Sequence, residues 1–292
     1  MTYRDLYNEA KSELKSAGIE AYEYETSALI EYIFGLNKAS LIIRYDDTIY
    51  DEALIRDFIE CLQRRIGGEP LQYITGYTDF YGRRFFVGKG VLIPRFDTEI
   101  LIDEVLSRLK QTKKPNVTDL CSGSGAIAIT LSKELKTGDF FAVELSDEAC
   151  KYLDINKRAN SAQNVNLIHG DIFNVYQNFE NGFFDAIVSN PPYIKTSEIS
   201  TLDADVLYEP KMALDGGGDG MMFYREIISK WTYKLKPGGL IAFEIDEGQQ
   251  DAIEKQLILN GYTDIKTQKD LQGLTRVISA IKINDSQRRS LL

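Results

Sequence analysis

Histidine and cysteine are scarce in this chain of 292 residues. The only histidine is His169, and the three cysteines, Cys61, Cys121 and Cys150, lie far apart. One histidine removes multi-histidine metal sites and argues against histidine triads and most histidine acid–base schemes. Widely spaced cysteines fit neither a disulfide framework nor a zinc site, so we expect no bound metal and a reducing compartment.

Basic residues and long apolar runs are also in short supply. The sequence has 34 Lys and Arg against 44 Asp and Glu, a formal net charge of −10. The electrostatic field of this negative charge repels phosphate backbones and anionic lipid. It disfavours a general nucleic-acid binder but is compatible with a local basic groove. No run approaches the roughly 18 apolar residues of a membrane span, and charge from Arg4 onward argues against a signal peptide. We expect a cytoplasmic protein without direct contact to nucleic acid or membrane.

The residues that are present fall into two parts joined by a linker. At about 150 residues per domain, the length suits two domains or one large one. Residues 1–79 show apolar residues at helical spacing with glycine stops, such as Leu6, Ala10 and Leu14 before Gly18, and predict a small helical domain. Residues 80–94 place β-prone runs around Gly88-Lys89-Gly90 and predict a β-hairpin linker. Residues 95–292 form the second, larger domain.

Acidic charge is concentrated in the N-terminal part. Residues 1–80 contain 8 basic and 15 acidic side chains, whereas the remainder contains 26 and 29. A solvated acidic surface explains this distribution, and so does an acidic face that meets a basic protein partner.

Strands and helices alternate beyond residue 97, which is typical of an α/β fold. Short β-prone runs at 117–121, 140–144, 165–168, 184–189 and 240–245 are separated by helical patterns, including one at 221–235 that ends before a turn at Pro237-Gly238-Gly239. Two more strands are predicted near 263–267 and 274–282. This alternation predicts a mostly parallel sheet with helices on both faces.

The first candidate site is a nucleoside pocket. Cys121, Ser122, Gly123, Ser124 and Gly125 join a predicted strand to a helix, where glycines let the backbone approach a ligand and the helix N-terminus offers free N–H groups. Glu144 ends the next strand about 20 residues later, a position that suits the hydroxyls of a ribose. Asp171 ends the third strand and can accept from an adenine amino group, while Ile172 can cover the ring. NAD and S-adenosylmethionine both fit this pattern, and a glycine turn with a capping Glu144 is the structural alternative.

The second candidate site is the loop Asn190-Pro191-Pro192-Tyr193, which follows an apolar strand. Ligands bind at the carboxyl ends of strands in open α/β sheets, and Pro191 restricts Asn190 to extended conformations. The Asn190 side-chain carbonyl and a proline backbone carbonyl can accept from one NH₂ group, and Tyr193 can stack on a planar group. Two aimed acceptors favour the pyramidal nitrogen that attacks a methyl sulfonium. This pattern indicates transfer of a methyl group to a planar NH₂ group.

These motifs together resemble a known family. The order DLCSGSGAIAI, AVELS, GDIF and VSNPPY is similar to class I S-adenosylmethionine-dependent methyltransferases that act on planar NH₂ groups. The blocks PLQYI at 70–74, IPR at 93–95 and DTE at 97–99 are more specific and resemble the HemK family of peptide chain release factor glutamine methyltransferases. The likeness extends over nearly the whole chain.

The resemblance implies a fold, a reaction and a set of site residues. The fold is a class I methyltransferase domain, Rossmann-like with a seven-stranded and mostly parallel sheet, a small N-terminal helical bundle for substrate recognition and a connecting β-hairpin. The reaction moves a methyl group from S-adenosyl-L-methionine to the glutamine amide in the Gly-Gly-Gln motif of class 1 release factors. Residues 121–125, Glu144, Asp171, Ile172 and Asn190 would bind the cofactor. Asn190, Pro191, Pro192 and Tyr193 would bind the substrate, with Asn190, Pro191 and Tyr193 catalytic.

The chain departs from the family pattern at four positions. Cys121 replaces a usual glycine, Phe96 a usual proline, Glu144 a common aspartate and Ile172 a frequent aromatic residue. None removes a catalytic atom, but Cys121 requires that the first turn tolerate a side chain. The alternatives are an amino methyltransferase of DNA or RNA bases, which shares the NPPY loop, and a non-catalytic nucleotide-binding or dehydrogenase-like protein, for which that loop would have no purpose.

Overall fold

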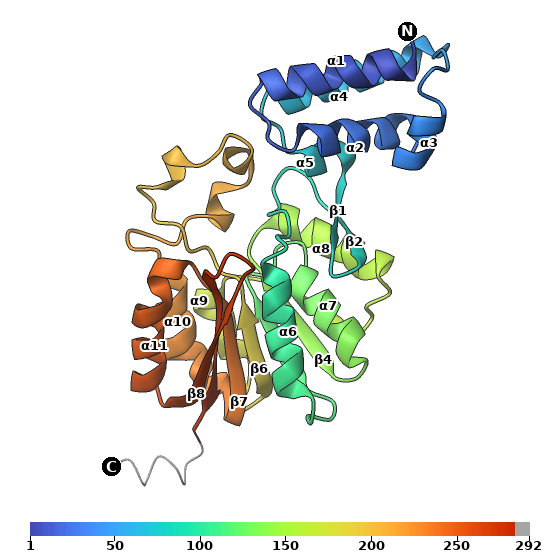
Figure 1. Cartoon of the computed structure of the whole chain (residues 1–292). Helices are drawn as coiled ribbons and strands as arrows, with labels where there is room; N and C mark the ends of the chain where they lie inside the picture. The colour runs from blue at the N-terminus through green and yellow to red at the C-terminus, as the bar shows by residue number, and fades with distance from the viewer. Residues whose placement is uncertain (284–292) are drawn as a thin grey trace. The chain divides into compact units, whose positions relative to one another are not determined.

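The computed structural model describes residues 1–283, and their packing divides into two compact units. The first unit comprises Met1–Tyr77 together with Asp203–Tyr208, and the second comprises Thr78–Leu202 and the described chain from Glu209 onward. Figure 1 shows the elements of each unit along the chain. No sequence pattern distinguishes Asp203–Tyr208 from the residues on either side, so its packing with the N-terminal helices was not expected.

Five α-helices build most of the first unit, which confirms the expected helical N-terminal region. They are α1 (Tyr3–Ser16), α2 (Tyr22–Phe34), α3 (Lys38–Ile43), α4 (Glu52–Ile66) and α5 (Leu71–Thr75). Thr2 and Asp5 form a capping box that fixes the start of α1, and Asp51 accepts from two backbone N–H groups at the start of α4. The apolar stripes of the longer helices meet in one core that includes Leu14, Leu29 and Phe58.

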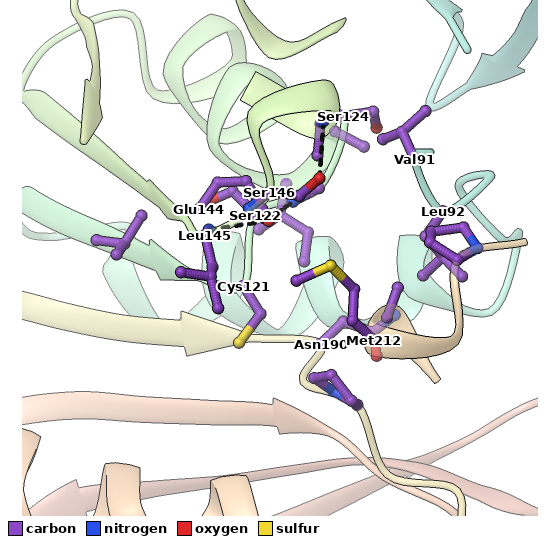
Figure 2. Close-up of a pocket in the computed structure, with 18 of the residues that line it drawn as sticks. Val91, Leu92, Cys121, Ser122, Ser124, Glu144, Leu145, Ser146, Asn190 and Met212 are labelled. Carbon is purple, nitrogen blue, oxygen red and sulfur yellow. Dashed lines mark hydrogen bonds between the residues drawn. The ribbon is translucent and has the colours of Figure 1, made fainter. Parts of the chain in front are cut away.

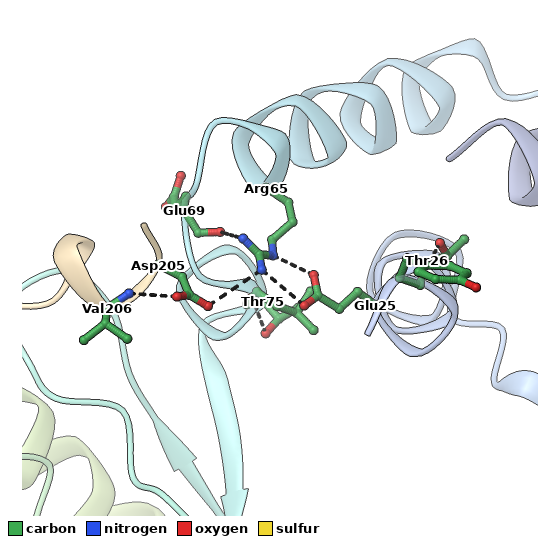
Figure 3. Close-up of polar contacts among 9 residues, drawn as sticks. Glu25, Thr26, Arg65, Glu69, Thr75, Asp205 and Val206 are labelled. Carbon is green, nitrogen blue, oxygen red and sulfur yellow. Dashed lines mark hydrogen bonds and ion pairs between the residues drawn. The ribbon is translucent and has the colours of Figure 1, made fainter. Parts of the chain in front are cut away.

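A buried ion pair connects three segments of this unit (Figure 3). The Arg65 guanidinium donates from Nε to Glu25 Oε2 at 2.6 Å and from Nη2 to Glu25 Oε1 at 3.3 Å, and both residues are 8% exposed. The Asp205 carboxylate lies 3.8 Å from Arg65 Nη2. The charge of Arg65 thus gives Asp203–Tyr208 a specific partner on α4.

We expect Glu25→Ala to destabilise the first unit by about 3 kcal/mol, because it leaves a buried guanidinium without its main partner. Hydrogen exchange of the α2 and α4 amides in the full chain measures this loss, and amides of the sheet in the second unit serve as an internal reference. Glu23→Ala is the matched control on α2, since Glu23 is exposed and pairs with Lys11 at the surface. Equal protection in the two variants would show that the Arg65 pair does not stabilise the unit.

The β-hairpin lies earlier than the sequence pattern predicts. Its strands are β1 (Tyr77–Phe80) and β2 (Arg83–Phe86), and it turns at Tyr81 and Gly82, with φ of 50° and 69°. The expected turn at Gly88-Lys89-Gly90 is therefore wrong. A Cβ on Gly88 would lie 2.0 Å from the Tyr152 hydroxyl, and one on Gly90 would lie 2.8 Å from Glu148 Cβ, so these glycines allow close packing on a helix.

A seven-stranded sheet with the order β5-β4-β3-β6-β7-β9-β8 forms the centre of the second unit. Its strands are β3 (Asn116–Leu120), β4 (Asp139–Glu144), β5 (Val165–His169), β6 (Phe184–Ser189), β7 (Leu235–Glu244), β8 (Tyr262–Lys269) and β9 (Thr275–Lys282). The first five are parallel, whereas β9 pairs antiparallel with β7 and β8. The expected mostly parallel α/β sheet is confirmed.

Helices cover both faces of this sheet (Figure 1). The core of one face includes residues of α6 (Thr98–Leu109), α7 (Ala126–Leu135) and α8 (Asp147–Ala159). The core of the other includes α9 (Ile172–Val175), α10 (Met222–Lys230) and α11 (Gln250–Leu259). Strand residues therefore alternate between two apolar layers, as the period of two requires.

Two details near β7 differ from the sequence prediction. The helix expected at 221–235 ends at Lys230 and continues as a 3₁₀ turn to Lys234. Pro237-Gly238-Gly239 lies within β7, where pairing jumps from Phe184–Leu235 to Ala186–Leu240, so the extra residues bulge out of the ladder. Among the helices of residues 1–283, none is both long and apolar enough to cross a membrane.

Candidate active site

A pocket opens at the carboxyl ends of β3, β4, β5 and β6 (Figure 2). Nine of the predicted site residues line it: Cys121, Ser122, Gly123, Ser124, Glu144, Asp171, Ile172, Asn190 and Pro192. Their motifs lie far apart in the sequence, and the parallel sheet gathers them because all these strands end at the same edge. Gly125, Pro191 and Tyr193 are not among the lining residues.

The loop after β3 has the left-handed backbone that its glycines suggest. Gly123 has φ of 53° and Gly125 has φ of 82°. A Cβ on Gly125 would lie 2.9 Å from Leu153, so this glycine permits close packing on α8, whereas Gly123 has open space beside it. Cys121 also has a positive φ, 61°. Glycine adopts this left-handed conformation more easily than residues with a Cβ, so the turn must tolerate a strained cysteine here.

Glu144 fixes the loop through its carboxylate. Oε2 accepts from Gly123 N at 2.7 Å, and Oε1 accepts from Leu145 N at 2.9 Å and from Ser146 N at 2.8 Å. The side chain is 8% exposed and lines the pocket. Each carboxylate oxygen has more than one acceptor position, so bracing the loop and accepting from a ribose are compatible roles.

Asp171 and Ile172 lie together on the pocket wall at the end of β5. Asp171 Oδ1 accepts from Phe173 N at 2.9 Å and caps the short helix α9. Ile172 is buried, and its carbonyl accepts from the Trp231 indole at 3.0 Å. Phe223, whose ring contacts Phe173, also lines the pocket and adds the aromatic surface that Ile172 lacks.

The NPPY loop is held from two sides. Asn190 Nδ2 donates to Thr98 Oγ1 at 3.3 Å. The Tyr193 carbonyl accepts from Gln249 Nε2 at 3.0 Å, and burial raises the pKa of the Tyr193 hydroxyl. A Cβ on Gly216 would lie 2.7 Å from the Tyr193 backbone, so that glycine lets a neighbouring segment close on the loop.

Sequence reasoning missed several residues that shape the site. Val91, Leu92, Thr98, Met212 and Phe223 line the pocket from segments outside the motifs (Figure 2 labels three of them). Glu209 is buried, accepts from Ile93 N at 2.8 Å and pairs with Arg95, which fixes the wall from 91 to 95. The IPR block belonged to the family resemblance, but nothing in the sequence indicated that it meets Glu209.

Asn156 is another missed residue. It is fully buried on α8, and its Nδ2 donates to the Ser124 carbonyl at 3.0 Å and to the Phe86 carbonyl at 2.9 Å. Its Oδ1 accepts from Phe86 N at 2.6 Å. One amide therefore fastens the hairpin strand β2 to the glycine loop, and we infer that it positions the loop.

A buried carboxyl group underlies the glycine loop. Asp119, at the end of β3, is 1% exposed, and burial raises its pKa to about 8. Oδ2 accepts from Ala128 N at 3.1 Å, whereas Oδ1 has no hydrogen-bond partner among the described residues. Because only the folded state keeps the proton between about pH 4 and pH 8, stability must fall as pH rises through this range.

We expect Asp119→Asn to remove this part of the pH dependence. The difference in free energy of unfolding, variant minus parent, should increase by on the order of 3 kcal/mol between about pH 5 and pH 8. Urea unfolding at several pH values measures the slope. Asp139→Asn, on the exposed end of β4, is the control. Parallel slopes for parent and Asp119→Asn would contradict a raised pKa.

The pocket has the shape and chemistry for a nucleoside with a charged tail. The glycine loop leaves open space at Gly123, Glu144 supplies carboxylate oxygens, and Ile127, Val143 and Phe223 supply apolar walls. These features fit S-adenosylmethionine, whose ribose, adenine and sulfonium need acceptors, an apolar slot and nearby negative charge. Among residues 1–283, no group of three or more His, Cys, Asp or Glu residues could hold a metal ion.

Comparisons with known proteins agree with this geometry. The PrmC N-terminal domain family matches residues 5–76, and the methyltransferase small domain family matches residues 97–235. A release factor glutamine methyltransferase of Thermodesulfovibrio yellowstonii is 39% identical over 258 residues, 87% of this chain and 90% of the relative. Another, from Clostridium acetobutylicum, is 36% identical over 285 residues, 97% of this chain and 99% of the relative.

A solved structure is similar in fold alone. The catalytic domain of hMettl16 in complex with the MAT2A 3'UTR hairpin 1 aligns with a TM-score of 0.57 at 14% identity. The alignment covers 81% of this chain and 82% of that one. The likeness supports the class I methyltransferase architecture.

Proposed function

Because the chain belongs to the release factor glutamine methyltransferase family, we propose that it methylates the side-chain amide of the glutamine in the Gly-Gly-Gln motif of class 1 peptide chain release factors. The methyl donor is S-adenosyl-L-methionine. The observation that carries the proposal is the position of Asn190. It lines the same pocket as the glycine loop and Glu144, on a loop that two prolines stiffen.

The residues of the chain have distinct tasks in this reaction. Residues 121–125, Glu144, Asp171 and Ile172 hold the donor, which supplies an electrophilic methyl group when bound. The Asn190 side-chain carbonyl and a backbone carbonyl of the adjoining prolines accept from the substrate NH₂ group. These bonds would favour the pyramidal nitrogen for attack on the methyl group. The N–C bond would form as the S–C bond breaks, S-adenosylhomocysteine would leave, and the extra proton would pass to water. Tyr193 packs against the core and does not line the pocket, so its stacking on the planar substrate amide requires a substrate that extends past Asn190.

Amino groups of DNA or RNA bases are the alternative substrate, since they share the planar NH₂ group. The formal net charge of −10 opposes binding of a phosphate backbone. A methyl-transfer assay that offers release factor, DNA and RNA in parallel decides between them. Transfer to release factor alone supports the proposal, and transfer to nucleic acid alone refutes it.

The acidic first unit is the proposed recognition surface for the protein substrate. A glutamine side chain offers too little surface to select one protein, so selection needs a second contact region. Residues 1–80 carry −7 of the formal net charge of −10, and α4 exposes Asp57 and Glu60. Charge complementarity raises encounter rate and specificity, so this surface suits a basic region of a release factor.

We expect Asp57→Lys with Glu60→Lys to lower kcat/KM for whole release factor about 10-fold at low salt, because steering by charge is lost. The loss should shrink at high salt. A short Gly-Gly-Gln peptide, which lacks the rest of the release factor surface, should be methylated as before. This charge reversal is cleaner than deletion of residues 1–80, which removes β1 from the hairpin and the helices on which Asp203–Tyr208 packs.

The matched control is Glu180→Lys with Asp251→Lys, which makes the same charge change at exposed positions of the second unit. Equal losses for the two double variants would mean that net charge alone matters. Equal losses on protein and peptide would mean that the first unit braces the active site. Either result would count against a recognition surface on α4.

The proposal also places the enzyme in the cytoplasm, where release factors act in translation termination. All three cysteines are unpaired in the structure, which suits a reducing compartment.

A further inference from the structure

A buried carboxyl group lies beside the NPPY loop and has no part in the assignments above. Glu244 ends β7 and is 3% exposed, and its Oε2 has no hydrogen-bond partner among the described residues. An orphaned buried carboxylate is costly, so its retention calls for a reason.

The sheet register brings Glu244 next to Asn190. Ser189 of β6 pairs with Phe243 of the parallel strand β7. The next residue of each strand, Asn190 and Glu244, therefore emerges side by side at the carboxyl edge of the sheet. Glu244 is held there by its own backbone, because its carbonyl accepts from the Tyr224 hydroxyl at 2.7 Å.

Thr98 completes the group from a third element. It begins α6, is 4% exposed and accepts from Asn190 Nδ2 at 3.3 Å. A hydroxyl that accepts one bond can donate another, and a carboxylate can only accept. Burial raises the pKa of the Glu244 carboxyl to about 7, and the neighbouring polar side chains of Thr98 and Asn190 oppose this rise.

We propose that Glu244, together with Thr98, is a positioning residue that fixes the orientation of the Asn190 carboxamide. An asparagine amide can present either its oxygen or its nitrogen to a ligand, and only the oxygen can accept from the substrate NH₂ group. Nδ2 donates to Thr98 Oγ1, and the Glu244 carboxyl beside it on the neighbouring strand favours the same orientation, with the nitrogen directed into the protein and Oδ1 toward the pocket. This inference rests on the proposed function, since it names the groups that aim its acceptor.

Glu244→Gln tests the proposal with little change of shape. A glutamine can turn its NH₂ group toward Asn190, which removes the preference for one amide orientation. We expect kcat on a Gly-Gly-Gln peptide to fall about 10- to 100-fold, less than the loss of a preorganised acceptor itself, with peptide KM and the Kd of S-adenosylhomocysteine nearly unchanged. Glu247→Gln, an exposed carboxylate three residues later, is the matched control and should keep the parent kcat.

Thr98 variants separate positioning from simple support of the fold. Thr98→Val removes the hydroxyl and should lower kcat, whereas Thr98→Ser keeps it and should restore most of the rate. If the groups act as one unit, adding Glu244→Gln to Thr98→Val should cost much less than the product of the two single effects. Fully multiplicative losses would overturn the proposal, as would a parent-like kcat in Glu244→Gln.

A readout without turnover keeps the inference separate from the proposed function. The side-chain NH₂ protons of Asn190, assigned by NMR through their absence in Asn190→Ala, should exchange slowly with water in the parent and faster in Glu244→Gln. Equal exchange in the two proteins would overturn the positioning role. A parent enzyme that fails to methylate glutamine but shows the exchange difference would refute the proposed function and leave the positioning of Asn190 intact.

Discussion

Replacing Asn190 with alanine is expected to lower kcat at least 100-fold while leaving the Kd of S-adenosylhomocysteine within a few-fold of the parent value. The loss corresponds to about 3 kcal/mol, the usual effect of removing one preorganised polar partner from a transition state. Asn190 is half-buried at the end of β6, and the hydrogen bond from its side-chain amide to Thr98 holds it in place.

Rapid-quench kinetics on a Gly-Gly-Gln peptide measure this effect, and calorimetry measures cofactor affinity. Asn174→Ala, an exposed asparagine on α9, is the matched control and should behave like the parent. A kcat near that of the parent in Asn190→Ala would contradict the proposed mechanism. A collapse of cofactor affinity would instead mean that Asn190 mainly builds the pocket.

Glu144→Ala has the second largest expected effect, a rise of about 10- to 100-fold in the Kd of S-adenosylhomocysteine. A charge-assisted acceptor is worth roughly 1.5–3 kcal/mol, and the ribose hydroxyls lose theirs. The loop loses support too, since Gly123 N donates to the same carboxylate at 2.7 Å. Affinity for the protein substrate should change far less.

Glu148→Ala is the matched control, because Glu148 lies on the next helix, is exposed and pairs with Lys151 at the surface. Glu144→Gln separates the two roles of the residue, since it keeps the shape of the side chain but loses the charge. An unchanged Kd in Glu144→Ala would reduce Glu144 to a structural residue of its turn.

Contiguous motifs explain why much of the fold and pocket could be predicted from the sequence. The glycine loop, Glu144, Asp171 and Asn190 each follow a recognisable strand, and parallel strands must end at one edge. The local sequence patterns and this topological rule are therefore enough to predict that these four features lie close together.

The residues that position the site could not be found in the same way. Thr98 and Glu244 reach Asn190 only through the packing of α6 and the register of β7 on β6, and no local pattern encodes either. The pairing of Arg65 with Asp205 likewise joins residues far apart in the sequence.

The misplaced hairpin shows a different limit. The pair Gly88 and Gly90 is typical of a turn, whereas the single glycine at Gly82 is a weaker turn signal. The structure uses Gly88 and Gly90 for contact with Tyr152 and Glu148, while Tyr81 adopts a positive φ without being glycine. A glycine needed for close packing and one needed for a turn cannot be told apart by sequence alone.

Mass spectrometry of a purified class 1 release factor after incubation with the full chain and S-adenosylmethionine tests the central claim most directly. The account predicts one added methyl group on the peptide that contains Gly-Gly-Gln, located on the glutamine side chain and absent when Asn190→Ala replaces the parent. An unmodified glutamine in the presence of an enzyme that binds the cofactor, or a methyl group on another residue, would contradict it.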